Sequence, residues 1–178
     1  KYFKPEGENG DFENYKSDVK LLPWKVIAEF KGKDLEGMEY EQLLPSEANT
    51  LESIRGIVKD ANPFHVMIDS FVTTEDGTGI VHTAPAFGAD DYKVGKKYGI
   101  GILTLVDREG KFVDGLGEFS LRFVKNYKDD ANYVDVNVDI SVKLKKENRA
   151  FKVEKYEHSY PHCWRTDKPI IYYPLDAW

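Results

Sequence analysis

The sequence predicts an α+β fold that is mostly β, with short strands arranged as a barrel or sandwich and a few flanking helices. Apolar runs of strand length recur at close spacing along the 178 residues, and turns rich in glycine, proline and acidic residues separate them. Only two or three stretches have apolar residues at helical spacing. With 41% hydrophobic residues the chain is long enough to bury a core, so we expect one domain over residues 1–178.

The first part of the chain predicts strands separated by polar segments. Residues 1–20 are polar and have the composition of a loop, and the polar segment 46–62 permits no assignment. The strands are expected at 21–30, 38–44 and 63–72.

The central stretch, residues 77–97, has an unusual order of elements. Glycines form a turn, a short apolar strand ends at Pro85, a glycine-containing loop covers 86–89, and Asp90 and Asp91 open a helix that continues through Lys97. We expect the apolar positions of this helix at Tyr92, Val94 and Tyr98. Acidic residues at a helix start are favoured by the free N–H groups there, which is the commoner explanation. A carboxylate directed into a cleft, where it could hold a cation, is the functional alternative.

The remainder of the sequence has patterns typical of strands and of a helix. A strand over 101–106 leads into a hairpin loop at 107–111 and then into Phe112 and Val113. A helix is expected to begin with the amphipathic residues 121–127, and Val136, Ile140 and Leu144 form a helical stripe that ends near Asn148. Residues 151–156 alternate as a strand, and 159–178 are expected to run extended.

Composition excludes several classes of protein. A net charge of −6 argues against broad neutralisation of nucleic-acid phosphates, although a pocket for one nucleotide at a strand end stays open. The single cysteine excludes an internal disulfide and fits a reducing cytoplasm, where we expect the protein. No apolar run approaches a membrane span, and we expect no membrane partner. The start lacks a signal peptide and an initiator Met, so we expect an excised piece of a longer protein.

Motifs for covalent catalysis, phosphate binding and metal binding are missing from the sequence. There is no Gly-x-Ser-x-Gly elbow, and Gly77-Thr-Gly79 has neither the Lys of a P-loop nor a third glycine. Cys163 is a lone thiol, and the four histidines are scattered, so we expect no metal site. His82 is ambiguous, because a strand histidine is more often structural than a ligand. Strand geometry places Ile80, His82 and Ala84 on one face, from which they could converge on the start of the helix.

The motif Gly-Thr-Gly-Ile-Val-His-Thr-Ala-Pro-Ala-Phe-Gly-Ala-Asp-Asp-Tyr (77–92) resembles the signature of the barrel-like editing domain, or connective polypeptide 1, of isoleucyl-tRNA synthetases, which are class I synthetases. The segment 32–40 resembles the family's Gly-x-x-Leu-x-Gly-x-x-Tyr. Residues 158–178, with His-Ser-Tyr-Pro-His-Cys-Trp-Arg, resemble the return segment toward the catalytic Rossmann core. The valine and leucine enzymes share the Gly-Thr-Gly start and the final Asp but lack the residues between, which favours isoleucine.

The resemblance implies an aminoacyl-ester hydrolase that removes valine from the 3′ end of tRNA(Ile), inside a ligase whose parent chain uses ATP. Such editing is needed because an isoleucine pocket cannot strongly reject a side chain that is one methylene smaller. In the family, the acid that matches Asp91 anchors the α-ammonium of the substrate, and the histidine that matches His82 excludes isoleucine. Ala84, Phe87 and Gly88 match the rest of the pocket loop. A positioned water cleaves the ester, and no cofactor is implied for this segment.

Two departures from the family accompany this resemblance. The family's pocket also uses a Thr-Thr-Thr-Pro-Trp-Thr peptide, and this chain starts after it. We therefore expect part of the site here, and the alternative is a non-catalytic insertion that binds the tRNA end or serves the structure. Some members bind zinc through Cys-Trp-Arg-Cys, whereas this chain has Thr166 at the second cysteine position.

Overall fold

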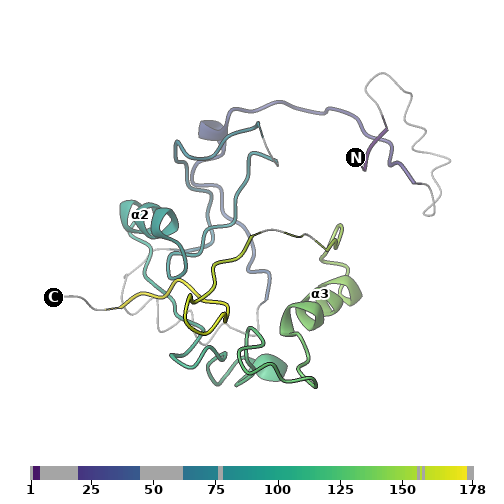
Figure 1. Ribbon diagram of the computed structural model, residues 1–178. Coiled ribbons are helices and arrows are strands. Elements are labelled where there is room, and N and C mark those ends of the chain that lie inside the picture. Colours follow the sequence, from purple (N-terminus) through teal and green to yellow (C-terminus); the bar gives the residue numbers. More distant parts are fainter. Residues whose placement is uncertain are drawn as a thin grey trace. The chain divides into compact units, whose positions relative to one another are not determined.

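The structure is a computed structural model that describes residues 2–4, 20–44, 62–75, 78–155, 157 and 159–175. Most of the unassigned segment 46–62 lies outside these residues. The chain divides into two compact units, Lys1–Leu35 and Glu36–Trp178. The described part of the first unit contains the short 3-10 helix η1 (Gly32–Leu35). The second contains the helix α2 (Ala89–Lys97), the 3-10 helix η3 (Gly117–Phe119) and the helix α3 (Val136–Lys146), and Figure 1 shows α2 and α3.

The prediction of a mostly β, barrel-like fold is wrong. No strand forms in the described ranges, and the extended segments of Figure 1 meet at isolated bridges only. The expected strands at 21–30, 38–44, 63–72, 80–85, 101–106 and 151–155 are therefore not present as strands. The bridges are Phe3 with Leu22, Glu39 with His65, Val106 with Phe112, Lys111 with Phe123, and His162 with Pro169.

Backbone hydrogen bonding explains this result in residues 63–72. A strand needs a neighbour that pairs with its N–H and C=O groups along its length. Here the N–H of Phe64 donates to the side chain of Asn62 at 2.9 Å, and that of Ile68 donates to the hydroxyl of Tyr98 at 3.1 Å. Backbone pairing is confined to residues 64–66: the N–H of Val66 donates to the carbonyl of Met38 at 2.8 Å, and the carbonyls of Val66 and Phe64 accept the N–H groups of Gly37 and Tyr40 at 2.8 and 2.9 Å. The apolar pattern suited a strand, but the backbone pairing covers only these few residues, and the N–H groups of Phe64 and Ile68 bind side chains instead.

The hairpin loop predicted at 107–111 is confirmed. Asp107 and Lys111 close it, with the N–H of Asp107 donating to the carbonyl of Lys111 at 2.7 Å. Asp107 Oδ1 also accepts the N–H groups of Glu109 and Lys111 at 2.8 and 2.9 Å, which is the local role that favours aspartate in turns. The helical start expected at 121–127 is wrong, because Leu121 and Phe123 pair with the returning arm of this hairpin.

The helix predicted around Val136, Ile140 and Leu144 is confirmed as α3. Asp135 caps it, accepting the N–H of Asn137 at 2.9 Å. Val136 is fully buried, and Arg122 binds Asp139 on the next turn at 2.6 Å. The helix is therefore fixed at its first turns by a cap, a buried side chain and a partly shielded ion pair.

The buried apolar residues of the described part are few and lie in or next to α2, η3, α3 and the hairpin. They are Ala86, Val94, Val106, Leu116, Phe119 and Val136. Several large apolar side chains are instead exposed, among them Ile27, at 91%, and Trp164, at 85%. Most of this small core belongs to elements near α2, the hairpin and α3.

Candidate functional site

The loop that precedes α2 is a tight turn built around Pro85. The N–H of Phe87 donates to the carbonyl of Ala84 at 2.8 Å, so Ala84–Phe87 form a β-turn with proline at its second position, where its fixed φ is favourable. Gly88 follows in an extended conformation as the N-cap residue, and its carbonyl accepts the N–H of Tyr92 at 2.8 Å. The predicted order of proline, glycine loop and acidic helix start is confirmed. The strand predicted before the proline is not present.

The helix α2 has one shielded face, and Asp91 is on it. Val94 and Gly95 are buried, Asp91 and Tyr98 are half-buried, and the remaining positions from Ala89 to Lys97 are exposed. The shielded residues follow the spacing i, i+3, i+4 and i+7, which is one stripe of an α-helix. The prediction that Tyr92 belongs to the apolar face of this helix is wrong, because its side chain is exposed.

The two neighbouring acids have different surroundings. Asp90 is exposed and forms an ion pair with Lys93, with 2.9 Å between Oδ1 and Nζ. The carboxylate of Asp91 folds back toward Gly88, so that Oδ2 lies 2.6 Å from the place where a Cβ on Gly88 would be. Among the residues with described placement, none forms a hydrogen bond or an ion pair with the Asp91 side chain. This half-buried negative charge is therefore available to a cationic ligand.

His82 lies in the extended segment that leads into the turn, and it is exposed. Its neighbours Ile80 and Val81 are also exposed, by 73% and 52%, so the expected alternation between two strand faces is not present. Ala84, Phe87 and Gly88 are half-buried in and after the turn. The structure thus brings Ala84, Phe87, Gly88 and Asp91 together along the turn and the first helical turn, with His82 two residues before Ala84.

Two contacts fix α2 near its C-terminal end. A Cβ on Gly95 would lie 2.9 Å from Cγ of Pro85, so the absence of a side chain lets the helix approach the turn closely. Directly after the helix, Gly99 has a φ of 68° and the N–H of Ile100 donates to the carbonyl of Gly95 at 2.8 Å, which is a Schellman motif.

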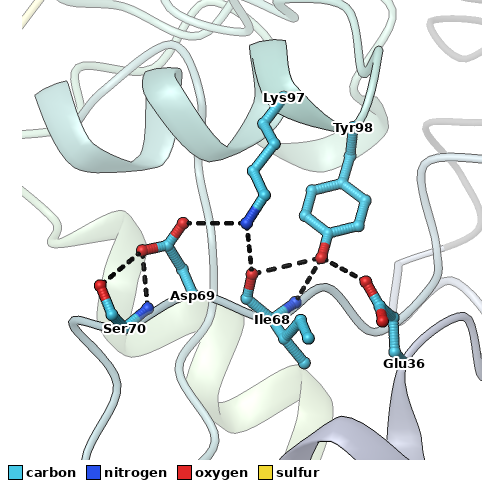
Figure 2. A network of polar contacts seen from close by, with 6 residues as sticks. All are labelled: Glu36, Ile68, Asp69, Ser70, Lys97 and Tyr98. Carbon is cyan, nitrogen blue, oxygen red and sulfur yellow. Dashed lines mark hydrogen bonds and ion pairs between the residues drawn. The ribbon is translucent and has the colours of Figure 1, made fainter.

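A polar network joins the end of α2 to residues 36 and 68–70 (Figure 2). The Tyr98 hydroxyl donates to Glu36 Oε1 at 2.6 Å and accepts the N–H of Ile68 at 3.1 Å. Lys97 Nζ donates to the carbonyl of Ile68 at 3.2 Å and lies 3.5 Å from Asp69 Oδ2. The N–H of Ser70 lowers the pKa of the Asp69 carboxyl, and the charge of Lys97 acts in the same direction. Sequence reasoning missed this network, although the i+7 spacing from Asp91 to Tyr98 indicates a shared face.

No group of three or more potential ligands that could hold a metal ion is present in the described ranges. Cys163 lies in a turn, where its carbonyl accepts the N–H of Asp167 at 2.8 Å. The Thr166 hydroxyl donates to the thiol and lowers its pKa, and the backbone N–H groups of Arg165 and Thr166 add to this effect. Within the same ranges, no helix has the length and apolar character that crossing a membrane requires.

Comparison with known proteins decides the family. No family model matches the chain. It is 46% identical over 201 residues to an isoleucine–tRNA ligase of Cytophaga hutchinsonii, and 43% identical over 206 residues to one of Bacteroides fragilis. The chain belongs to the isoleucyl-tRNA synthetase family. An isoleucine–tRNA ligase of Thermoplasma acidophilum, 47% identical over 155 residues, covers 87% of this chain.

The alignment also fixes how much of a synthetase the chain represents. The matches to the Cytophaga and Bacteroides synthetases cover 100% and 99% of this chain but only 17% of each relative. The chain therefore corresponds to a portion of the length of these synthetases, and the turn, the helix α2 and Asp91 lie within that portion.

Proposed function

We propose that this chain is the editing domain of an isoleucyl-tRNA synthetase, spanning residues 1–178, in which residues 158–178 return toward the catalytic core. Its reaction is the hydrolysis of valine from the 3′ end of misacylated tRNA(Ile). Water attacks the ester carbonyl, the terminal ribose oxygen leaves with a proton, and free valine and intact tRNA are released. The parent chain uses ATP to attach isoleucine, and the expected location is the cytoplasm.

The observation that supports this proposal is the position of Asp91. An aminoacyl ester carries an α-ammonium group, and a carboxylate that is partly shielded from water binds such a cation better than one exposed to solvent. Asp91 is half-buried and has no partner among the described residues, whereas Asp90 is exposed and paired with Lys93. Of the two adjacent acids, Asp91 is therefore the one suited to anchoring a substrate.

The turn before α2 supplies the remaining contacts in this proposal. Ala84, Phe87 and Gly88 line the side-chain pocket, and His82 forms the wall that excludes isoleucine. Orientation accounts for most of the rate, since the ester is already activated and a water held near its carbonyl reacts as in an intramolecular process. Asp91 supplies that orientation by fixing the amino group, and it forms no covalent intermediate.

The two acids provide a matched experiment in the full-length synthetase. We expect Asp91→Ala to lower the rate of valyl-tRNA(Ile) deacylation by about 100-fold or more, because a misplaced substrate loses most of the benefit of orientation. Asp90→Ala removes the same charge one residue earlier and should leave deacylation near the wild-type rate. Isoleucine activation, measured by ATP–pyrophosphate exchange, should not change in either variant.

Unchanged deacylation in Asp91→Ala would contradict the proposal. A wild-type synthetase that does not deacylate valyl-tRNA(Ile) would favour the alternative, a non-catalytic insertion that binds the tRNA end. Equal losses in both aspartate variants would show that the helix start contributes through general electrostatics and not through one anchoring carboxylate.

A further inference from the structure

We infer that Tyr98 is a positioning residue of the editing site: its hydroxyl sets the rotation of α2 and thereby the direction of the Asp91 carboxylate. This inference rests on the proposed function. It adds a residue outside the signature motif, at the opposite end of the helix from the acid, that acts on the substrate only through Asp91.

The first part of the argument is the geometry of α2. Asp91 and Tyr98 are seven residues apart, which places them on the same helix face and about 10 Å apart along the axis. Both are half-buried, and the buried residues Val94 and Gly95 lie between them on the same stripe. A rotation of the helix about its axis would therefore move the acid and the tyrosine in the same direction.

The second part is the contact between Gly95 and Pro85, which fixes distance but not rotation. The close approach of the Gly95 backbone to the proline ring holds the C-terminal half of the helix against the turn. A glycine offers no side chain that could interlock with its neighbour, so this contact alone leaves the helix free to turn about its axis.

The third part is the direction and number of hydrogen bonds at Tyr98. Its single hydroxyl is joined to two separate segments, through Glu36 Oε1 at 2.6 Å and through the N–H of Ile68 at 3.1 Å (Figure 2). The bond to Glu36 is short and charge-assisted, which makes it stronger than a bond between neutral groups. These bonds are directional, so they hold one rotational setting of the helix end.

Tyr92 provides a control on the same helix. It is 43% exposed and lies outside the shielded stripe. Tyr92→Phe and Tyr98→Phe therefore remove the same hydroxyl group from one helix. Only the Tyr98 hydroxyl forms the hydrogen bonds described above.

The test uses the full-length synthetase and steady-state deacylation of valyl-tRNA(Ile). We expect Tyr98→Phe to lower kcat about ten-fold, since a small misplacement of an orienting group has an effect of this order. The KM for the tRNA should stay within about two-fold, because Tyr98 is proposed to act on the substrate only through Asp91, and the melting temperature and isoleucine activation should match the wild type. Tyr92→Phe should leave kcat unchanged.

Variants of Glu36 give a second, independent readout. Glu36→Gln keeps an acceptor for the tyrosine hydroxyl and should retain most of the rate, whereas Glu36→Leu should lose part of it. In the double variant Glu36→Leu/Tyr98→Phe, the loss should be no greater than in Tyr98→Phe alone, as expected for residues that act as one unit.

Wild-type kcat in Tyr98→Phe would overturn the inference, and so would an equal fall in deacylation, isoleucine activation and melting temperature, which indicates a general structural role. Failure of the proposed function has a different outcome, namely that Asp91→Ala deacylates at the wild-type rate. When Asp91→Ala is inactive and Tyr98→Phe is fully active, only the role of Tyr98 is rejected.

Discussion

Asp91 and Gly88 share one small volume at the start of α2, because the carboxylate of Asp91 lies where a side chain on Gly88 would begin. The 2.6 Å between Oδ2 and the Cβ position is too short for any real contact. Gly88 has an ordinary extended backbone, so its dihedral angles do not call for glycine, whereas a Cβ at this position would require the Asp91 carboxylate to shift. The smallest residue at the N-cap thus permits the position of the acid.

Gly88→Ala tests this relationship. The new methyl group should displace the carboxylate, and we expect valyl-tRNA(Ile) deacylation in the full-length synthetase to fall about ten-fold. Gly32→Ala is the control, since nothing lies within 4 Å of its Cβ position. Equal deacylation in the two variants would show that the acid can move aside without consequence.

Gly95→Ala tests the contact between α2 and the turn. Alanine is favoured over glycine inside a helix by about 1 kcal/mol. The new Cβ would lie 2.9 and 3.1 Å from two carbons of the Pro85 ring, however, and such overpacking costs about 1–3 kcal/mol. We expect faster amide hydrogen exchange over residues 84–97 in the full-length protein. The double variant Pro85→Ala/Gly95→Ala should recover slow exchange, and failure to do so would assign the effect to another contact.

Tyr127→Phe should leave stability unchanged or raise it by up to about 1 kcal/mol. The Tyr127 hydroxyl is buried and has no hydrogen-bond partner in the described part of the chain, and an unsatisfied polar group destabilises a fold. Burial raises the pKa of this hydroxyl to about 12. The folded state therefore keeps the proton while the unfolded state loses it near pH 10, so stability should fall between about pH 10 and 12.

That pH dependence can be measured by thermal unfolding of the wild type and Tyr127→Phe at several alkaline pH values. The loss of stability above pH 10 should be smaller in the variant, which has lost one of the groups that release a proton on unfolding. Identical curves for the two proteins would contradict the assignment of a raised pKa to Tyr127.

The alkylation rate of Cys163 should report the hydrogen bonds of its turn. Because Thr166 and the adjacent N–H groups stabilise the thiolate, the pKa of Cys163 is below its usual value of 9.0. The pH midpoint of iodoacetamide labelling should therefore lie below 9.0 in the protein and rise in Thr166→Val. Thr166→Ser keeps the hydroxyl and should retain the low midpoint. A midpoint that does not respond to either change would exclude the side-chain hydrogen bond.

Local signals predicted the helices and the hairpin loop. The acidic pair before a short amphipathic run gave α2, the spacing of Val136, Ile140 and Leu144 gave α3, and the composition of 107–111 gave the hairpin loop. Each of these depends on interactions within a few residues, which sequence patterns record well.

The strands were mispredicted because a strand depends on partners that are distant in the sequence. Apolar runs such as 63–72 suit a strand, but the N–H of Ile68 binds a tyrosine 30 residues away, which no local pattern records. The candidate site shows the same division. The motif was enough to name Asp91 as a candidate. The difference in exposure between Asp91 and Asp90, and the shared helix face of Asp91 and Tyr98, became visible only in the structure.

The seven-residue interval from Asp91 to Tyr98 fixes the relative orientation of these two side chains around the axis of α2. Inserting or deleting a single residue inside it would rotate one end by about 100° relative to the other, so that the acid and the tyrosine could no longer face the same way. Substitutions at Lys93 and Lys96, which lie outside the polar network, should be tolerated, while any change in the number of residues should not. Substitutions on the exposed face of this helix are therefore expected to be compatible with the site, whereas the number of residues between the acid and the tyrosine is expected to stay constant.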